Sequence, residues 1–218
     1  IKGSENPLPI NYLENKGSAQ VKSSIILAGL KTKGKTFIKS KPSRNHTELL
    51  CKYLKLPLKV KKKKNYDLIE VEKAQKIKPL NYKIPSDISS AAFFIVLTAL
   101  SNNSKLLIKN VNINPSRIGI ITILKKMGVN IKFKNKKNYK GEHVADISIT
   151  SSKKLRGINC PPKLNSGAID EFLIIFLVAA KASGVSYFKD IGELNQKESP
   201  RLKWGAKILS KMGIKTIT

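Results

Sequence analysis

Arginine is scarce in this sequence, yet it recurs at one kind of position. The chain holds 42 basic residues, but arginine occurs only at positions 44, 117, 156 and 201. Arg44, Arg117 and Arg201 each follow a corner of proline and serine that precedes an amphipathic segment. A guanidinium is a planar fork that binds a carboxylate or a phosphate through two hydrogen bonds, which lysine does less well. The pattern predicts anion binding or a structural brace at each corner, and for Arg117 we favour the brace.

Two further polar residues stand at the start of predicted helices. Ser18 has the residue type of an N-cap, and the free N–H groups and dipole of a helix N-terminus also favour an anion. Asp170 begins an apolar helical segment, where capping is again the default role. Ser18 is therefore a candidate for both capping and anion binding, since the two roles are compatible.

These residues belong to a unit that occurs three times. Each copy runs through an apolar helix, a Gly or Asn turn, a short strand, an arginine corner, an amphipathic helix and a basic strand. The apolar helices are predicted at residues 18–30, 87–100 and 170–182. The short strands are predicted at residues 36–40, 105–111 and 185–191. Repetition of helices and strands in this order predicts an α/β fold.

The helix ends and helix surfaces add detail to the repeated unit. The sequences KMGV at 126–129 and KMGI at 211–214 are near copies of each other. Glycine after the last helical turn is expected as a C-cap because it tolerates the left-handed conformation, and a strand is expected to follow it. The first helix of each copy is apolar nearly all round, so we expect strands to enclose it on several sides.

The net charge of +28 is large enough to suggest a polyanionic partner. The lysines are scattered through predicted turns and exposed strand positions, however. Aromatic residues make up only 6% of the chain, so it offers no evident platform for stacking bases. We therefore favour a solvated, lysine-rich surface over a nucleic-acid interface.

Composition also indicates where the protein is located in the cell and how the chain is divided into domains. Apolar residues make up 41% of the chain, enough for a core, and no apolar run approaches the about 20 residues of a membrane span. Cys51 and Cys160 are too few for a disulfide framework, and the N-terminus lacks a signal-peptide pattern, so we expect a cytoplasmic protein. The polar segment 76–85 holds two prolines and is the best linker, which predicts domains at 1–83 and 84–218.

Six stretches, in order along the whole chain, resemble motifs of the EPSP synthase family. SAQVKS at 18–23, followed by ILAGL, resembles the family's SAQVKSA-ILLAGL helix, and PSRNHTE at 42–48 resembles PSRDHTE. PSDISSAAF at 85–93 resembles PGDISSAAFF, and NPSRIG at 114–119 resembles NPTRTG. IDE at 169–171 resembles the IDE of the catalytic helix, and ELNQKESPR at 193–201 resembles ELRVKESDR.

The resemblance implies a fold of two lobes, each made of three βαβαββ-type units. This is the inside-out, α/β barrel-like fold of the enolpyruvyl transferases, with substrates bound in the cleft between the lobes. The chain would hold one unit of the first lobe and two of the second, an internal fragment of about half the family's length that is incomplete at both ends. A catalytic lysine and further arginines would lie outside it, so we expect the chain alone to be inactive.

The same resemblance implies a transferase activity. The enolpyruvyl (1-carboxyvinyl) group of phosphoenolpyruvate passes to the 5-hydroxyl of shikimate 3-phosphate, with release of phosphate, in the shikimate pathway to chorismate and the aromatic amino acids. The reaction needs positioned acids and bases and a cationic site for two polyanions, but no metal or organic cofactor. The implied partners are these small anionic substrates, with no nucleic acid and no membrane, and the complete protein is expected to be a monomer.

Roles for single residues follow from the matched motifs. The residues implied to bind shikimate 3-phosphate are Ser18, Ala19, Gln20, Arg44, Asp170 and Lys197. Those implied to bind phosphoenolpyruvate are Gln20, Glu198 and Arg201. Of these, Asp170 would accept the proton of the 5-hydroxyl, and Glu198 would transfer a proton at the methylene carbon.

The sequence departs from the family's pattern in one motif. Pro200 stands where the family has an aspartate, and Asn195 and Gln196 replace Arg-Val, which alters the surroundings of the neighbouring cations. Proline nevertheless suits the first helical position. Three alternatives stay open: the sister enolpyruvyl transferase that acts on UDP-N-acetylglucosamine, a basic nucleic-acid-binding fragment, and a catalytically silent remnant.

Overall fold

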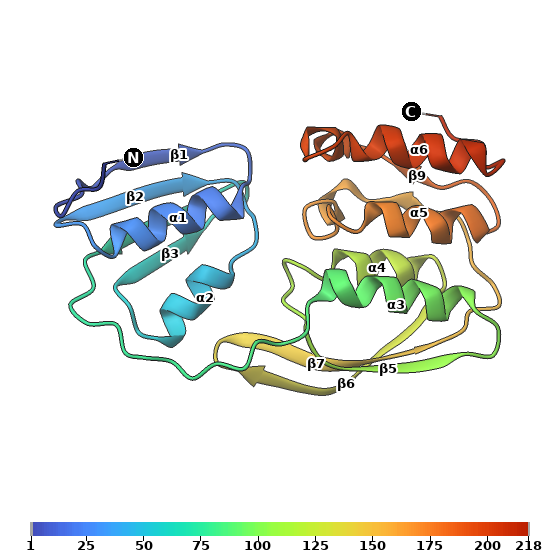
Figure 1. The fold of residues 1–218 in the computed structure, drawn as a ribbon, viewed down its shortest axis with the longest axis horizontal. Coiled ribbons are helices and arrows are strands. Elements are labelled where there is room, and N and C mark those ends of the chain that lie inside the picture. Colours follow the sequence, from blue (N-terminus) through green and yellow to red (C-terminus); the bar gives the residue numbers. More distant parts are fainter. Residues whose placement is uncertain (1, 218) are drawn as a thin grey trace. The chain divides into compact units, whose positions relative to one another are not determined.

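Helices and strands alternate along residues 2–217, the part of the chain that the computed structural model describes (Figure 1). These residues fall into two units. The first holds the chain up to Lys83 together with Asn138–Glu142, and the second holds Ile84–Lys137 and the residues from His143 onward. Each unit combines helices with a sheet, so the predicted α/β class is confirmed.

The first unit folds in the order βαβαββ. Its elements are β1 (Asn11–Glu14), α1 (Ala19–Gly29), β2 (Lys35–Ser40), α2 (His46–Tyr53), β3 (Leu58–Lys62) and β4 (Asp67–Glu72). The strand order is β1-β2-β4-β3, with β1 parallel to β2 and the other neighbouring pairs antiparallel. The parallel pair matters for the site, because β1 leads into α1 and β2 leads into the corner that holds Arg44.

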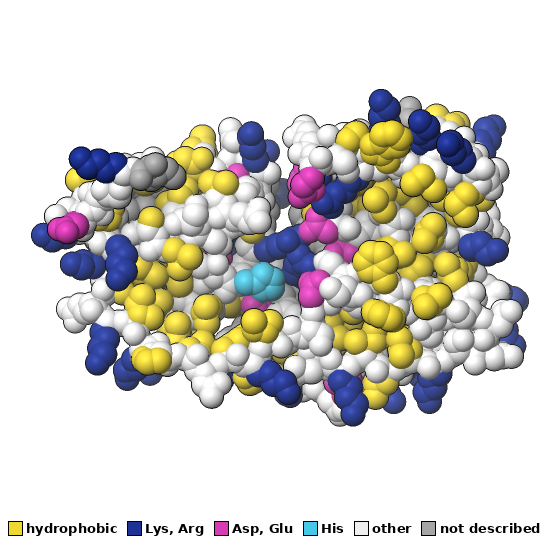
Figure 2. Space-filling model, in the orientation of Figure 1, with side chains coloured by type: hydrophobic (Ala, Val, Ile, Leu, Met, Phe, Trp, Pro, Cys, Tyr) yellow, Lys and Arg dark blue, Asp and Glu magenta, His cyan; other side chains and the backbone are white. Residues whose placement is uncertain are grey.

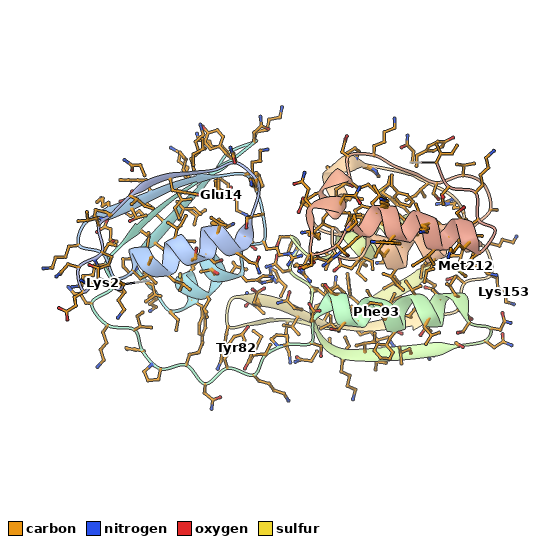
Figure 3. All side chains as sticks on the ribbon, turned by 45° about the horizontal axis from the view of Figure 1, so that its top comes forward. Lys2, Glu14, Tyr82, Phe93, Lys153 and Met212 are labelled. Atoms are coloured by element: carbon orange, nitrogen blue, oxygen red, sulfur yellow. The ribbon has the colours of Figure 1, made fainter. Side chains whose placement is uncertain are left out.

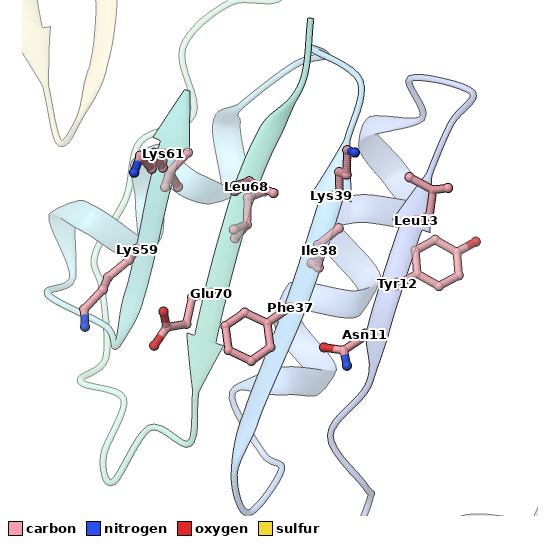
Figure 4. Close-up of a pocket in the computed structure, with 12 residues that line it drawn as sticks. Asn11, Tyr12, Leu13, Phe37, Ile38, Lys39, Lys59, Lys61, Leu68 and Glu70 are labelled. Atoms are coloured by element: carbon pink, nitrogen blue, oxygen red, sulfur yellow. The ribbon is translucent and has the colours of Figure 1, made fainter. Parts of the chain in front are cut away.

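One face of this sheet carries the core of the first unit. Along β2, buried and exposed residues alternate, which is the period of two of a half-buried strand. The helices α1 and α2 cover the buried face, whose apolar residues are Ile26, Leu30, Ile38, Cys51, Ile69 and Val71. Figure 4 shows the other face, where Phe37 and Leu68 line a shallow hollow of about 640 Å³. No residue predicted for the site lines this hollow.

The second unit contains the remaining helices and strands, with residues 138–142 of β6 and β7 counted in the first. They are α3 (Ile88–Leu100), β5 (Lys105–Asn112), α4 (Gly119–Lys126), β6 (Asn130–Tyr139), β7 (Glu142–Thr150), β8 (Asn159–Cys160), α5 (Phe172–Lys181), β9 (Tyr187–Phe188) and α6 (Arg201–Lys211). The strands form a three-stranded sheet in the order β5-β7-β6 and a parallel pair of β8 and β9. Short 3-10 turns at Pro162–Leu164 and Gly192–Gln196 precede α5 and α6.

Buried apolar side chains join the helices of the second unit. Ile95 of α3, Leu124 of α4 and Phe172 of α5 are fully enclosed in one cluster. The glycine cap predicted after α4 is confirmed, because Gly128 has a φ of 96° and follows the C-cap residue Met127. A Cβ at Gly128 would also meet the carbonyl oxygen of Lys154 at 2.7 Å, so conformation and close approach both require glycine.

The helix of the third copy begins later than predicted. α5 starts at Phe172, and Glu171 takes the N-cap position without a side-chain capping bond. Asp170 therefore lies in the preceding turn and is not the N-cap residue of α5, so the default capping position does not apply to it. Its carboxylate instead contacts cationic side chains.

The strands of the third copy are shorter than predicted. Only Tyr187–Phe188 forms a strand where residues 185–191 were expected. Gly184 and Asp190 have φ values of 82° and 58°, which interrupts the extended backbone on both sides of this strand. Residues 214–217 form no strand either, and the end of that expected strand, Thr218, lies outside the described residues.

The apolar helices are not enclosed as the sequence predicted. Phe93, Phe94 and Leu97 of α3 are 62%, 58% and 65% exposed, and Leu27 of α1 is 58% exposed. Figure 3 labels Phe93 on α3. Figure 2 shows further hydrophobic side chains on the same face of the second unit. Among the described residues, strands cover only one side of these helices, and the prediction was wrong for that reason. Even so, within residues 2–217 no helix combines the length and the hydropathy needed to cross a membrane.

Candidate functional site

The eight residues predicted for the site are divided equally between the two units. One group is Ser18, Ala19, Gln20 and Arg44, and the other is Asp170, Lys197, Glu198 and Arg201. The first group lies at and before the N-termini of α1 and α2, and the second at and before those of α5 and α6. Every predicted residue thus stands near a helix start, where backbone N–H groups lack partners within the helix.

The N-terminus of α1 has the properties of an anion-binding site. Ser18 is the N-cap, and its Oγ accepts the N–H of Val21 at 3.3 Å, so the predicted cap is confirmed. The first turn of α1 contains no acidic side chain. The positive end of the helix dipole at Ala19 and Gln20 is therefore not neutralised by a carboxylate of its own helix.

A buried carboxylate holds the turn that leads into α1. Glu14, at the end of β1, is 4% exposed and accepts the N–H groups of Lys16 and Gly17 at 2.9 and 2.8 Å (Figure 3). Gly17 has a φ of 78°, which favours glycine. Glu14 was not predicted as part of the site; it stands three residues before Gly17, and its role in this turn was not evident from the sequence.

Two side-chain contacts join the Arg44 corner to α1. Lys22 Nζ of α1 lies 2.6 Å from Glu48 Oε1 of α2, and both side chains are buried. Next to this pair, the hydroxyls of Ser23 and Thr47 are 2.7 Å apart. Arg44 lies just before α2, so these two contacts also hold the Arg44 corner against α1. The N-terminus of α1 carries Ser18, Ala19 and Gln20, the other residues predicted to bind an anion in this unit.

The same corner holds buried hydroxyls that the sequence analysis missed. Ser40 Oγ, at the end of β2, and Ser43 Oγ, beside Arg44, are buried and make no hydrogen bond within residues 2–217. Buried polar atoms usually have a partner. Ser40 and Ser43 are therefore additional candidates for contact with a polar ligand. The signal in the sequence was weak, because serine at the end of a half-buried strand also suits a purely structural position.

Asp170 is the centre of the group in the second unit. Its Oδ1 lies 3.5 Å from Arg201 Nη1 and 3.9 Å from Lys197 Nζ, and its Oδ2 lies 3.9 Å from Arg117 Nη1. The side chain of Asp170 is 28% exposed. Three cations from two separate segments of the chain thus approach one partly exposed carboxylate.

Lys197 and Arg201 each make a further ion pair with a glutamate near the start of α6. Lys197 Nζ lies 3.1 Å from Glu193, and Arg201 Nη2 lies 2.5 Å from Glu198. Glu198 is exposed, and its pKa is lowered, first by a hydrogen bond from its own backbone N–H and then by Arg201. Pro200 is the N-cap residue of α6 and not its first helical residue, which corrects the position expected from the sequence.

Arg117 braces the turn that holds Asp170. Its side chain is 11% exposed, and Nη2 lies 2.5 Å from Ser89 Oγ and 3.2 Å from Asp87 Oδ1 at the start of α3. Glu171 is 3% exposed and accepts a short hydrogen bond from Ser89. The structural role favoured for Arg117 is confirmed by these contacts. Within residues 2–217, no group of three or more His, Cys, Asp and Glu side chains is arranged to hold a metal ion.

Comparison with known proteins gives one consistent family. The family model for EPSP synthase (3-phosphoshikimate 1-carboxyvinyltransferase) matches residues 2–218. The chain is 43% identical over 216 residues to the 3-phosphoshikimate 1-carboxyvinyltransferase of Ruthia magnifica subsp. Calyptogena magnifica, and it covers 48% of that protein. It is 42% identical to the enzyme of the same name from Caldicellulosiruptor bescii, covering 49% of it.

A solved structure gives the same result. The EPSP synthase of Acinetobacter baumannii matches 98% of this chain with a TM-score of 0.87 and 40% sequence identity, and 47% of that structure is covered. The chain spans about half the length of the curated relatives it matches. The match extends over both units and over every predicted site residue. The chain therefore belongs to the EPSP synthase family.

Proposed function

We propose that the full-length protein transfers the enolpyruvyl group of phosphoenolpyruvate to the 5-hydroxyl of shikimate 3-phosphate and releases phosphate. The observation that carries the proposal is the approach of Lys197 and Arg201 to one oxygen of Asp170, with Glu198 beside them. A proton acceptor, a proton-transfer group and two cations in one small region are what an addition and elimination between two anions requires. Family membership supports the same reaction.

The chemistry divides into two steps. In the addition, Asp170 accepts the proton of the 5-hydroxyl, the oxygen bonds to C2 of phosphoenolpyruvate, and the methylene carbon takes a proton at Glu198. In the elimination, Glu198 takes a proton back from that carbon, now a methyl, the C2–C3 double bond reforms and the C2–O bond to phosphate breaks. The leaving phosphate takes the proton held by Asp170, so both carboxyl groups return to their starting states. Both residues thus work as acid and base at positions set by the turns before α5 and α6.

The residues of the first unit would bind the phosphate of shikimate 3-phosphate. Ser18, Ala19 and Gln20 stand at a helix N-terminus without first-turn acid, which suits an anion. Arg44 would add a guanidinium to the same substrate, and Gln20 would also contact phosphoenolpyruvate. Ser40 and Ser43 would offer further hydroxyl donors from the same corner.

The cations of the second unit would exchange partners when substrates bind. Arg201 contacts Glu198 and Asp170, and binding phosphoenolpyruvate requires its guanidinium to turn toward the substrate carboxylate or phosphate. Lys197 contacts Glu193 and Asp170 and would instead contact the hydroxyls of shikimate 3-phosphate. The exposed position of Glu198 leaves room for this exchange.

The alternatives predict different results. A UDP-N-acetylglucosamine transferase would share the chemistry but not the requirement for shikimate 3-phosphate, and a nucleic-acid-binding fragment would show retention on DNA or RNA that falls steeply with salt. No feature of the described residues favours either over the proposed reaction. The cytoplasmic location and the monomeric state stay predictions, as does the absence of a nucleic-acid partner.

The deciding experiment is an assay of phosphate release by the purified full-length protein. We expect release only when phosphoenolpyruvate and shikimate 3-phosphate are both present. Release with UDP-N-acetylglucosamine instead would favour the sister enzyme, and a folded protein without release would favour a silent remnant. The 218-residue chain alone is expected to be inactive, and turnover by it would contradict the assignment of further ligands outside it.

A further inference from the structure

Arg117 is the most deeply anchored cation near Asp170. Its guanidinium contacts Ser89 Oγ at 2.5 Å and Asp87 Oδ1 at 3.2 Å, both at the N-terminus of α3. It is 11% exposed, whereas the side chains of Lys197 and Arg201 are 26% and 27% exposed. Arg117 is thus held by the core of the second unit and not by the turn before α6.

The two oxygens of Asp170 face different partners. Arg117 Nη1 lies 3.9 Å from Oδ2, while Lys197 and Arg201 both approach Oδ1. A carboxylate contacted through both oxygens has its plane and rotation restricted. The ion pair on Oδ2, made by the nearly buried Arg117, therefore helps to set where Oδ1 points.

The backbone joins the same two segments. The N–H of Gly119 donates to the carbonyl oxygen of Gly167 at 3.0 Å. A Cβ at Gly119 would lie 2.6 Å from the carbonyl carbon of Gly167, so the Arg117 corner packs directly on the segment that leads into Asp170. Glu171, next in sequence, lies 3.8 Å from Arg117 and accepts a hydrogen bond from Ser89. The corner, the start of α3 and the Asp170 turn form one connected network.

We propose that Arg117 is a positioning residue for Asp170, holding Oδ2 so that Oδ1 faces the place where the 5-hydroxyl proton is accepted. The inference rests on the proposed function, because it assigns a task to the orientation of Asp170. Arg117 itself does not bind substrate, since it is nearly buried and its Nη2 already contacts Asp87 and Ser89. Lysine cannot replace it, because a single ammonium cannot contact Ser89 and Asp170 through two separate nitrogens.

The test compares Arg117→Lys with Arg156→Lys in the full-length protein. Arg156 is an exposed arginine of the same unit whose Nε contacts the carbonyl oxygen of Lys126 at 3.0 Å, away from Asp170. We expect Arg117→Lys to lower kcat by about ten- to a hundredfold, the scale of a misplaced catalytic group. Both KM values should stay within about twofold, because ground-state binding is unchanged. Arg156→Lys should match the wild type.

Several outcomes would overturn the proposal. A raised KM with unchanged kcat would make Arg117 a direct substrate ligand, and unchanged kcat and KM would remove it from the mechanism. If Arg117→Lys does not fold, Ser89→Ala removes the anchor of the guanidinium instead, and it must lower kcat with KM unchanged for the proposal to stand. In an Asp170→Asn background, Arg117→Lys should have little further effect, and a full additional loss would show that it does not act through Asp170.

A crystal structure of Arg117→Lys separates this inference from the proposed function. We expect the Asp170 carboxylate to rotate away from Lys197 and Arg201, whichever reaction the protein catalyses. An Asp170 side chain in its wild-type orientation would overturn the positioning role. Full turnover by Asp170→Asn, in contrast, would overturn the proposed proton acceptor. The orientation of Asp170 in the Arg117→Lys crystal structure would still decide the positioning role independently.

Discussion

The candidate site residues of the first unit, at the starts of α1 and α2, differ from those of the second unit, before α5 and α6, in how their positive charge is balanced. At the start of α1, the first turn has no acidic side chain, and the nearest acidic residues, Glu14 and Glu48, are engaged by backbone N–H groups and by Lys22. Before α6, every cation is already paired with a carboxylate. The N-terminus of α1 is therefore suited to an anion without rearrangement, whereas the cations before α6 would have to exchange one set of ion pairs for another.

Under the proposed function, this difference suits the N-terminus of α1 to binding a substrate phosphate and the residues around Asp170 to proton transfer. A helix N-terminus needs no rearrangement to receive a phosphate and undergoes no charge change during turnover. Ion pairs among exposed side chains are weak and readily exchanged. Under the proposed function, the group around Asp170 would hold its carboxyl groups near their working positions and still release its cations to the substrate.

The largest effect is expected at the buried ion pair of the first unit. Lys22→Met removes the cation that faces Glu48 and leaves a buried carboxylate unpaired, which should destabilise the first unit by about 3–5 kcal/mol. Hydrogen exchange at the amides of α1 and α2 would measure the loss. Lys22→Met combined with Glu48→Leu should restore most of the protection, and Lys35→Met, which breaks an exposed pair, is the matched control. Unchanged protection from hydrogen exchange in Lys22→Met would show that the Lys22–Glu48 ion pair does not stabilise the first unit.

The second largest effect is expected at Glu198. Glu198→Gln keeps the shape of the side chain but cannot exchange a proton, so kcat of the full-length protein should fall by at least about a hundredfold. Glu72→Gln, at a partly exposed strand position of the first unit, should have no effect on kcat. Steady-state phosphate release measures both, and near-normal turnover by Glu198→Gln would remove it from its role.

A smaller effect is expected at the preformed anion site. Ser18→Ala removes a side-chain hydroxyl at the helix start, and the affinity for shikimate 3-phosphate should fall about tenfold, the scale of one hydrogen bond to a charged group. Calorimetric titration measures this affinity directly. Ser24→Ala is the control, because Ser24 Oγ donates to the carbonyl oxygen of Val21 on the same helix. Equal losses in both variants would point to general damage of α1.

The smallest effect is a pH dependence of stability in the second group. The pKa of Glu198 is lowered in the folded protein by its own backbone N–H and by Arg201. A lowered folded-state pKa contributes stability above the unfolded value of about 4.3 and loses it as the pH falls through the folded value. Glu198→Gln should therefore lower the urea midpoint slightly at pH 7 and not at pH 3. An equal shift of the urea midpoint at pH 7 and pH 3 would show that the charge of Glu198 and its ion pair with Arg201 do not cause the loss of stability.

Local features of this fold were predictable, and contacts between distant segments were not. The Ser18 cap and the glycine after α4 depend on a few neighbouring residues, and both were predicted. The length of the strand in the third copy was overestimated, because Asp190 has a positive φ, which is uncommon for a residue other than glycine and is not evident from the sequence. The exposed side of α3 was missed because an apolar helix does not reveal which elements cover it.

The candidate site divides in the same way. The roles of Asp170 and Glu198 came from motifs that resemble one family, since residue types alone suggested only a helix cap for Asp170. The cations that approach Asp170 come from positions 117, 197 and 201. Arg117 and Arg201 stand at equivalent corners of two copies, but this equivalence does not indicate that both approach one carboxylate. Ser40 and Glu14 were missed because a polar residue at a strand end suits a structural role equally well.

The most direct test of the central claim is turnover by Asp170→Asn in the full-length protein. Asparagine keeps the size and shape of the side chain but cannot accept the 5-hydroxyl proton, so kcat should fall by at least about a hundredfold while both substrates still bind. Asp190→Asn is the matched control, because asparagine tolerates the φ of 58° at that exposed position. Phosphate release at the wild-type rate by Asp170→Asn would contradict the account.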